Sequence, residues 1–187
     1  MLDPGAEPAS LPALAAALLA QVAIVQPGPD PTTQQLVAIG QHMLAWVRSP
    51  RTARELLAMP RACGKQELLY LLHVVAAQPA LYLVSDGPGV ASPPHEHSTW
   101  AVIVGLSGNE RNLLYGRDTS AGSLRLLRTV DIGANDVVHL RSDAIHATVA
   151  ADELATFHLH LYGKPLDELA PYASRCYVPF DDHTIGR

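Results

Sequence analysis

Two histidines separated by a single residue, His95 and His97, stand at the start of an apolar run in "SPPHEHSTWAVIVG". Side chains two positions apart in a strand point to the same face, so the two imidazoles are expected to converge. Such a pair alone fits a metal site and a polar strand face equally well. A third imidazole, His146 in "SDAIHATVA", completes a nitrogen site suited to Fe(II), Co, Ni, Cu or Zn, with positions left for water, substrate or oxygen.

A second group of polar residues, His158, His160 and Tyr162, alternates with apolar residues in "TFHLHLYG". Strand periodicity places all three on one face, an arrangement that suits a site inside a small barrel. Trp100 follows the histidine pair in the apolar run. We expect it to form part of a pocket wall that binds substrate and limits the access of water.

The spacing of these residues resembles the cupin superfamily. "GVASPPHEH" has the glycine, five intervening residues and His-x-His of the first cupin motif, and "GANDVVHLRSDAIH" resembles a degenerate second motif. The glutamate usual in the first motif would fall at Ala101 or Val102, and neither side chain can bind a metal. A cupin with three histidines and no glutamate resembles the thiol dioxygenases, the family of cysteine dioxygenase and 3-mercaptopropionate dioxygenase. The likeness covers residues 80–165 and, more loosely, the helices before them.

That resemblance implies a fold, a cofactor and a reaction. The fold would be the cupin double-stranded β-helix, a jelly-roll barrel. The cofactor would be one Fe(II) per chain, held by His95, His97 and His146, with Zn or Ni as alternatives in the purified protein. The reaction would be the oxidation of a small carboxylate-bearing thiol, of the cysteine or 3-mercaptopropionate type, to its sulfinate with O2.

The family's Ser-x-His-x-Tyr strand is matched in part by "HLHLY". By resemblance, the hydroxyl of Tyr162 points at bound substrate or oxygen, and His160 orients it. His158 stands where the family has serine, so the usual relay is altered here. "STWAVIV" lacks the cysteine that animal enzymes crosslink to the tyrosine, so Tyr162 should be unmodified, as in bacterial members.

The residue that binds the substrate carboxylate is a second departure from the family. Animal enzymes have an arginine before the "LYLVS" strand, but "QELLYLLHVV" contains none. Bacterial mercaptopropionate enzymes use an arginine after the tyrosine, and Arg175 in "ASRCY" is the expected counterpart, several residues later. The identity of the thiol depends on this residue.

Two other classes of function remain open for a cupin with three histidines. One keeps the metal and changes the chemistry, because such cupins also cleave diketones or act as hydrolases and isomerases. The other is a non-catalytic protein that binds a metal or a small molecule. The strand with His160 and Tyr162 favours the thiol dioxygenase over both.

The elements that must position these residues predict a mainly β protein. We expect a single domain over 1–187, with a helical N-terminal part over 1–75 and a β-barrel over 80–187. Short Val-, Leu-, Tyr- and Thr-rich runs separated by turn residues are typical of a sandwich or barrel. The segment "GKQELLYLLHVV" is compatible with a helix or with a helix followed by a strand. The expected strands are "ALYLVS", "TWAVIVGL", "ERNLLYGR", "LRLLRTV", "NDVVHL", "HATVAA" and "ATFHLHLYG".

The helical part contains three candidate helices, which we expect to pack outside the β unit. "LPALAAALLAQVAIV" is an Ala/Leu-rich core helix. Thr32 or Thr33 can cap a second helix that runs to about Arg48, and "SPRTARELLAMP" is a short helix closed by Pro60.

The composition excludes several kinds of partner. With 187 residues, a net charge of -5 and a 48% hydrophobic fraction, the chain offers no basic face for nucleic acid and no segment that would span a membrane. Its two cysteines, Cys63 and Cys176, form no CxxC pair and favour a reducing, cytoplasmic location. The expected partners are therefore a small thiol and O2, and the composition carries no signal for an oligomeric state.

Overall fold

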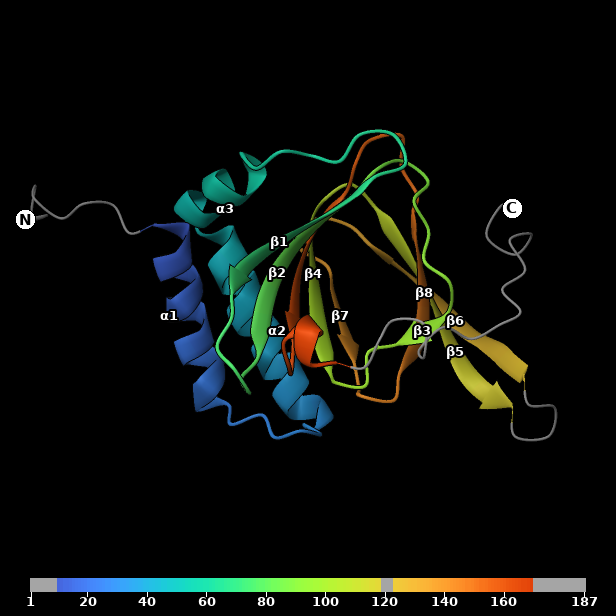
Figure 1. Cartoon of the computed structure of the whole chain (residues 1–187), viewed down its shortest axis with the longest axis horizontal. Coiled ribbons are helices and arrows are strands. Elements are labelled where there is room, and N and C mark those ends of the chain that lie inside the picture. The colour runs from blue at the N-terminus through green and yellow to red at the C-terminus, as the bar shows by residue number, and fades with distance from the viewer. Residues whose placement is uncertain (1–9, 119–122, 170–187) are drawn as a thin grey trace, which may run out of the picture.

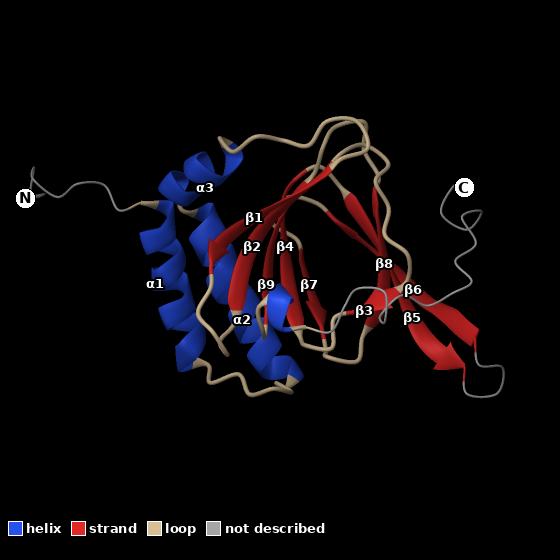
Figure 2. Cartoon of the chain, in the orientation of Figure 1, coloured by secondary structure: helices blue, strands red, loops and turns tan. Residues whose placement is uncertain are grey.

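The computed structural model describes residues 10–118 and 123–169. Three helices come first, and strands make up most of the rest of the described chain (Figures 1 and 2). The elements are α1 (Leu11–Ile24), α2 (Thr33–Arg48), α3 (Pro50–Leu57), β1 (Glu67–His73), β2 (Ala80–Asp86), β3 (His95–Glu96), β4 (Ala101–Ser107), β5 (Glu110–Asp118), β6 (Ser123–Ile132), β7 (Val137–Leu140), β8 (Ile145–Ala150), β9 (Phe157–Tyr162) and the 3-10 turn η1 (Leu166–Glu168).

Within the described residues the strands form two antiparallel sheets. The strand order is β1-β2-β9-β4-β7 in the five-stranded sheet and β3-β8-β5-β6 in the four-stranded sheet. From β2 onward the chain crosses repeatedly between the sheets, so that β2, β4, β7 and β9 lie in one while β3, β5, β6 and β8 lie in the other. This order is that of an eight-stranded jelly roll, with β1 added at one edge. The predicted fold class, a double-stranded β-helix, is confirmed.

The helices cover the outer face of the five-stranded sheet, as predicted (Figure 1). Helix α2 begins with a capping box, in which the Thr32 hydroxyl accepts from the backbone N–H of Gln35 and the Gln35 side chain accepts from the backbone N–H of Thr32. Both α1 and α3 have proline in the first turn, where the missing N–H costs no hydrogen bond.

An outer core of apolar side chains joins the helices to the sheet. Alternate residues of the central strand β9 contribute Phe157, Leu159 and Leu161, and α2 contributes Ile39 and other residues. A fully buried leucine of this kind stabilises the fold by about 1.5–3 kcal/mol. The remaining β9 side chains, His158, His160 and Tyr162, are buried on the opposite face, inside the barrel.

The segment "GKQELLYLLHVV", which the sequence left open between helix and strand, contains strand β1 over residues 67–73. The predicted helical part over 1–75 therefore extends too far, because the described helices end at Leu57 and β1 pairs with β2 along its length. The seven predicted strands are all present. The two-residue β3 was not among the strands named from the sequence, although the expected convergence of His95 and His97 assumed strand geometry there.

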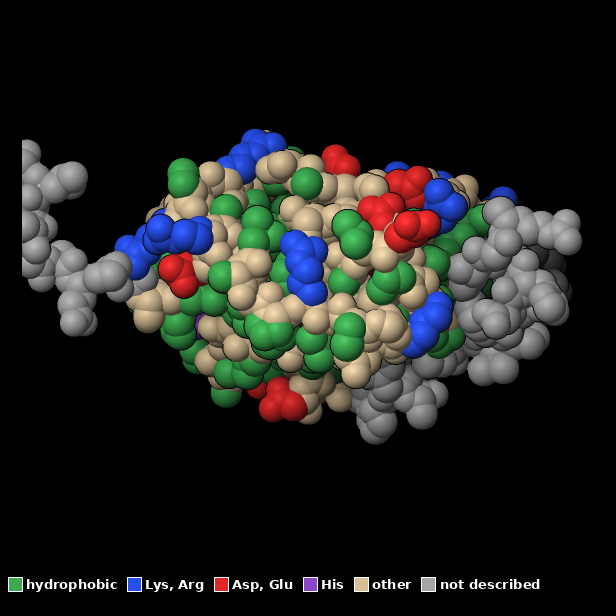
Figure 3. Space-filling view, turned by 90° about the horizontal axis from the view of Figure 1, so that it is seen from above, with side chains coloured by type: hydrophobic (Ala, Val, Ile, Leu, Met, Phe, Trp, Pro, Cys, Tyr) green, Lys and Arg blue, Asp and Glu red, His purple; other side chains and the backbone are tan. Residues whose placement is uncertain are grey.

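Charged side chains are dispersed over the face seen from above, where basic, acidic and apolar residues alternate (Figure 3). Among the described residues, no helix is both long and apolar enough to pass through a membrane.

Candidate metal centre

Strand register brings the three predicted histidines together. His95 in β3 pairs directly with His146 in β8, and His97 follows before the chain turns at Ser98, which adopts a positive φ of 54°. The side chains of all three histidines are buried. The Nε2 atom of His97 lies 3.2 Å from that of His95 and 3.3 Å from that of His146. The fold therefore brings His97 and His146, which are 49 residues apart in the sequence, into one group.

Hydrogen bonds to the outer nitrogens fix two of these rings. His95 Nδ1 lies 2.9 Å from the carbonyl oxygen of Pro93, and His146 Nδ1 lies 2.9 Å from Asn112 Oδ1. Each partner is an oxygen that can only accept, so Nδ1–H donates in both rings. A neutral imidazole carries one N–H, and the Nε2 lone pairs of His95 and His146 are therefore directed to the centre of the group.

This arrangement fits a metal ion. Ligand nitrogens at about 2.0–2.1 Å from a common ion lie about 3.0–3.4 Å apart, depending on geometry. The distances of 3.2 and 3.3 Å between Nε2 atoms fall in that range. Metal-bound histidines commonly donate their other N–H to a carbonyl or carboxylate group, as His95 and His146 do here. The three histidines form a group that can hold a metal ion.

The environment of His146 favours its neutral, metal-binding form. Burial lowers the pKa of His146 well below its ordinary value, and any positive charge on His97 or His95 lowers it further. Burial likewise lowers the pKa of His160 to well below the ordinary value. A neutral imidazole binds metal without first releasing a proton, so His146 is prepared for a cation near neutral pH.

Tyr162 lies against the group of three histidines. Its ring centroid is 4.9 Å from that of His97, and its hydroxyl lies 3.0 Å from Nδ1 of His160. Tyr82 packs edge-on against the same ring, with 5.8 Å between centroids. Because His160 and Tyr162 share one face of β9, the strand positions the phenol beside the group of three histidines.

A chain of buried polar residues extends from His146 to the other end of the barrel. Asn112 accepts from His146 Nδ1 and donates from Nδ2 to Glu110 Oε1 at 2.7 Å. The second oxygen of that carboxylate, Oε2, lies 3.4 Å from Nδ1 of His158. Asp86, Glu110 and His158 form a second group whose donor atoms lie within 4.8 Å of one another.

The carboxyl groups of this second group hold their protons unusually strongly. Burial, and then the nearby Glu110 and Glu67 carboxylates, raise the pKa of Asp86 to about 7. Burial also raises the pKa of Glu110 to about 7, although the hydrogen bond from Asn112 opposes it. Burial lowers the pKa of His158 to about 4, so this ring is neutral at pH 7.

Sequence reasoning missed Asp86, Glu110 and Asn112. The structure places Glu110 with Asp86 and His158, in a group separate from the three histidines. The available signal was the alternation of Glu110, Asn112 and Leu114 in a predicted strand, which directs two polar side chains and a leucine to one face.

Two predicted substrate-binding residues have different outcomes. The structure places Trp100 in the outer core, where its indole N–H donates to the carbonyl oxygen of Gly28 at 3.2 Å. This corrects its assignment to the pocket wall, because the residue before Ala101 in β4 faces the helices while Ala101 faces the barrel interior. Arg175 lies outside the described residues.

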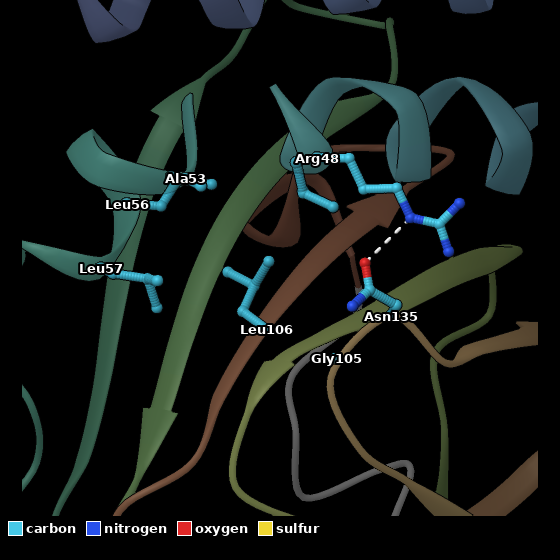
Figure 4. Close-up of a pocket in the computed structure, with 8 residues that line it drawn as sticks. Arg48, Ala53, Leu56, Leu57, Gly105, Leu106 and Asn135 are labelled. Carbon is cyan, nitrogen blue, oxygen red and sulfur yellow. Dashed lines mark hydrogen bonds between the residues drawn. The ribbon is translucent and has the colours of Figure 1, made fainter. Parts of the chain in front are cut away.

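A separate cleft of about 320 Å³ lies between the helices and the outer face of the sheet (Figure 4). Arg48 spans part of it and donates from Nε to Asn135 Oδ1 at 3.0 Å. The described residues that line the cleft include neither a histidine nor a carboxylate, so it does not belong to the metal centre. Its lining is Val47, Arg48, Ala53, Leu56, Leu57, Gly105, Leu106 and Asn135.

Comparisons with known proteins concern the fold. No protein-family model and no curated protein sequence matches the chain. Among solved structures, a cupin superfamily protein from Desulfitobacterium hafniense is 17% identical, with 57% of this chain and 84% of that chain covered and a TM-score of 0.44. An uncharacterised double-stranded β-helix protein from Klebsiella pneumoniae is 10% identical, with 65% and 94% covered and a TM-score of 0.47.

Oxalate oxidase in complex with the substrate analogue glycolate is a third similar structure. It is 12% identical, with 58% of this chain and 60% of that chain covered and a TM-score of 0.45. At such identities a likeness concerns the fold alone. The strand order described above independently establishes that fold as the double-stranded β-helix.

Proposed function

We propose that the protein is an iron-dependent thiol dioxygenase that oxidises a small carboxylate-bearing thiol to its sulfinate. The observation that carries the proposal is the position of Tyr162. Its ring lies 4.9 Å from that of His97, and its hydroxyl is held by His160 at 3.0 Å. Three converging imidazoles suit many reactions, but a phenol fixed beside them supplies the hydrogen-bond donor that this reaction uses.

The reaction needs no reductant beyond its own substrates. A thiolate and O2 give a sulfinate, because both oxygen atoms are added to sulfur, which is oxidised as the oxygen is reduced. Bound Fe(II) would supply a Lewis acid that lowers the thiol pKa and brings both reactants together. The reducing compartment expected from the cysteine content would keep the substrate thiol reduced.

The residues of this chain would hold and orient the reactants. His95, His97 and His146 would bind the iron, with the rings of His95 and His146 fixed by Pro93 and Asn112. Tyr162 would donate its hydroxyl proton in a hydrogen bond to the developing negative charge on oxygen or sulfur. His160 would orient that hydroxyl by donating from Nδ1–H to the phenol oxygen, which leaves the one hydroxyl proton of Tyr162 for the reactants. Arg175 would bind the substrate carboxylate in a bidentate pair.

Oxygen uptake by the Fe(II)-loaded protein tests the proposal. The panel is cysteine, 3-mercaptopropionate, mercaptosuccinate and cysteamine, with the sulfinate product identified by mass spectrometry. We expect uptake with a carboxylate-bearing thiol and little with cysteamine, which lacks the carboxylate. No uptake with any of the four would refute the proposal.

The role of Tyr162 has its own test. In Tyr162→Phe we expect kcat to fall about a hundredfold, the usual size for the loss of one donor to developing charge. The matched control is Tyr70→Phe, because the Tyr70 hydroxyl donates to the carbonyl oxygen of Pro60, away from the histidines. Equal rates in wild type and Tyr162→Phe would remove the phenol from the mechanism.

A further inference from the structure

A second cluster of buried side chains lies at the opposite end of the barrel interior from the three histidines. It consists of Asp86 at the end of β2, Glu110 at the start of β5 and His158 near the start of β9. On β5, Leu114 pairs with His146, and Glu110 is four residues away along the strand, a distance of about 13 Å at about 3.3 Å per residue. Two sheets therefore bring two carboxylates and one imidazole together.

Several atoms of this cluster lack hydrogen-bond partners. Within 10–118 and 123–169, no group hydrogen-bonds to Asp86 Oδ1 or to either ring nitrogen of His158. His158 is 0% exposed and Asp86 is 6% exposed. Buried polar side chains nearly always have a partner, so these atoms require one. A carboxylate oxygen and the unprotonated nitrogen of a neutral imidazole both offer lone pairs, and a cation satisfies both atoms together.

The spacing and the charge of the cluster agree with a metal ion. Glu110 Oε2 and His158 Nδ1 are 3.4 Å apart, about the separation of two ligands at about 2.1 Å from one tetrahedral ion. Two ionised carboxylates would neutralise a divalent cation, whereas without one their burial is costly. Glu67, which is exposed and pairs with Asp86 across β1 and β2, adds negative charge on the approach to the cluster.

We propose that Asp86, Glu110 and His158 bind a second divalent transition-metal ion, with ligands separate from those of the three-histidine site. Two carboxylates and one imidazole form a donor set richer in oxygen than three imidazoles, which favours Mn(II), Fe(II) or Zn(II) over softer ions such as Cu(I). This inference does not rest on thiol oxidation, because it concerns a different set of ligands.

The two sites would be mechanically connected through Glu110. Its Oε2 faces His158 in the cluster, while its Oε1 accepts from Asn112, which in turn holds the outer nitrogen of His146. A metal ion in the second site would fix the carboxylate, and thereby the amide that orients His146. The second site thus acts as a structural support for the first.

Cobalt titration of the metal-free protein tests the proposal. Co(II) is added without oxygen after chelator treatment, and bound metal is counted by elemental analysis after gel filtration. We expect two equivalents in wild type and one in His97→Ala, Asp86→Asn and His158→Gln. The visible spectrum of the remaining cobalt should differ between His97→Ala, which keeps the carboxylate site, and Asp86→Asn, which keeps the histidine site. The control Asp131→Asn removes an exposed carboxylate and should bind two equivalents.

Two results would overturn the proposal. One is the binding of a single equivalent of cobalt by wild type and by Asp86→Asn with the same spectrum. The cluster would then be a group of side chains that share protons and bind no metal. The other is two equivalents in both Asp86→Asn and His158→Gln. Circular dichroism establishes that each variant is folded, and His158→Gln, which keeps a polar amide in the barrel, replaces Asp86→Asn if the latter fails to fold.

Discussion

At the end of the barrel where β3 meets β8, His95 and His146 each donate from the outer nitrogen to an oxygen and direct the other nitrogen inward. At the end where β2 and β9 meet β5, Asp86 and His158 present buried atoms to one another without such partners among the described groups. The first site is oriented by its surroundings before any ligand binds. In the second, only Glu110 is fixed by such a hydrogen bond, from Asn112, so the order of Asp86 and His158 depends on what occupies the site.

Of the variants that distinguish the histidine end of the barrel from the carboxylate end, His97→Ala should have the largest effect on metal binding and oxygen uptake. His97 Nε2 is the atom that contacts both other Nε2 atoms, so its loss leaves two ligands that face no third. We expect the variant to lose the metal of the histidine site and all oxygen uptake, while the carboxylate site keeps its metal. Elemental analysis and oxygen electrode measurements check this result. Residual uptake at the wild-type rate would contradict it.

The pH dependence of stability should be specific to the carboxylate end. Unfolded carboxyl groups lose their protons near pH 4, whereas folded Asp86 and Glu110 keep them to a pKa of about 7. The folded state of the metal-free protein thus binds more protons over this range, and the stabilisation by these protons is lost as the pH rises from about 4 to about 7.

Asp86→Asn should therefore gain stability relative to wild type as the pH rises. The gain in the free energy of unfolding between pH 4 and pH 8 should reach at most about 4 kcal/mol, since one pKa unit corresponds to about 1.4 kcal/mol. Urea denaturation of chelator-treated wild type and variant at several pH values measures the difference. A difference that stays constant with pH would show that Asp86 titrates normally.

Asn112→Ala probes the connection between the two ends. The substitution removes the acceptor of His146 Nδ1–H and the donor to Glu110 Oε1. We expect metal affinity at the histidine site to fall about 10- to 100-fold, as is usual when a hydrogen-bond partner of a metal-bound histidine is lost. Competition with a chelator measures the affinity. Asn135→Gly is the control, because Asn135 lies on the helix side and has a positive φ of 70° that glycine accepts. Unchanged metal affinity in Asn112→Ala would show that the two ends of the barrel are not coupled through Asn112.

Thr32→Ala should have the smallest effect and should leave metal binding at both ends of the barrel unchanged. It removes the capping box of α2 and costs about 1 kcal/mol of stability. Thermal unfolding should show a lower Tm with unchanged cobalt stoichiometry. A changed stoichiometry would show that the helix layer, and not only the barrel, sets the geometry of the sites.

The sequence sufficed to predict the barrel strands, the pair of His95 and His97, and the polar row of the last strand from local patterns, whereas His146 lies 49 residues from His97 and was added as a third imidazole from the segment that resembles the second cupin motif. His95 and His97 are two residues apart, and His158, His160 and Tyr162 repeat with the period of a strand. These short spacings determine a shared face without knowledge of the fold.

The carboxylate cluster was not predictable in the same way. Asp86 and His158 are brought together by the pairing of β2 with β9, and Glu110 comes from the other sheet. No local spacing connects three residues from three strands. Trp100 shows the opposite error. Its proximity to His97 in the sequence suggested a place in the pocket wall, but its side chain lies in the outer core beside the helices.

Strand β9 is buried on both faces, with Phe157, Leu159 and Leu161 toward the helices and the histidines and tyrosine toward the barrel. Deletion of one residue at its start would exchange the two rows. The imidazoles would then point into the apolar outer core under the helices, and the leucines would point into the polar barrel interior. Length variation among natural or laboratory variants should therefore be absent from this strand, even though single-residue insertions are tolerated in surface loops.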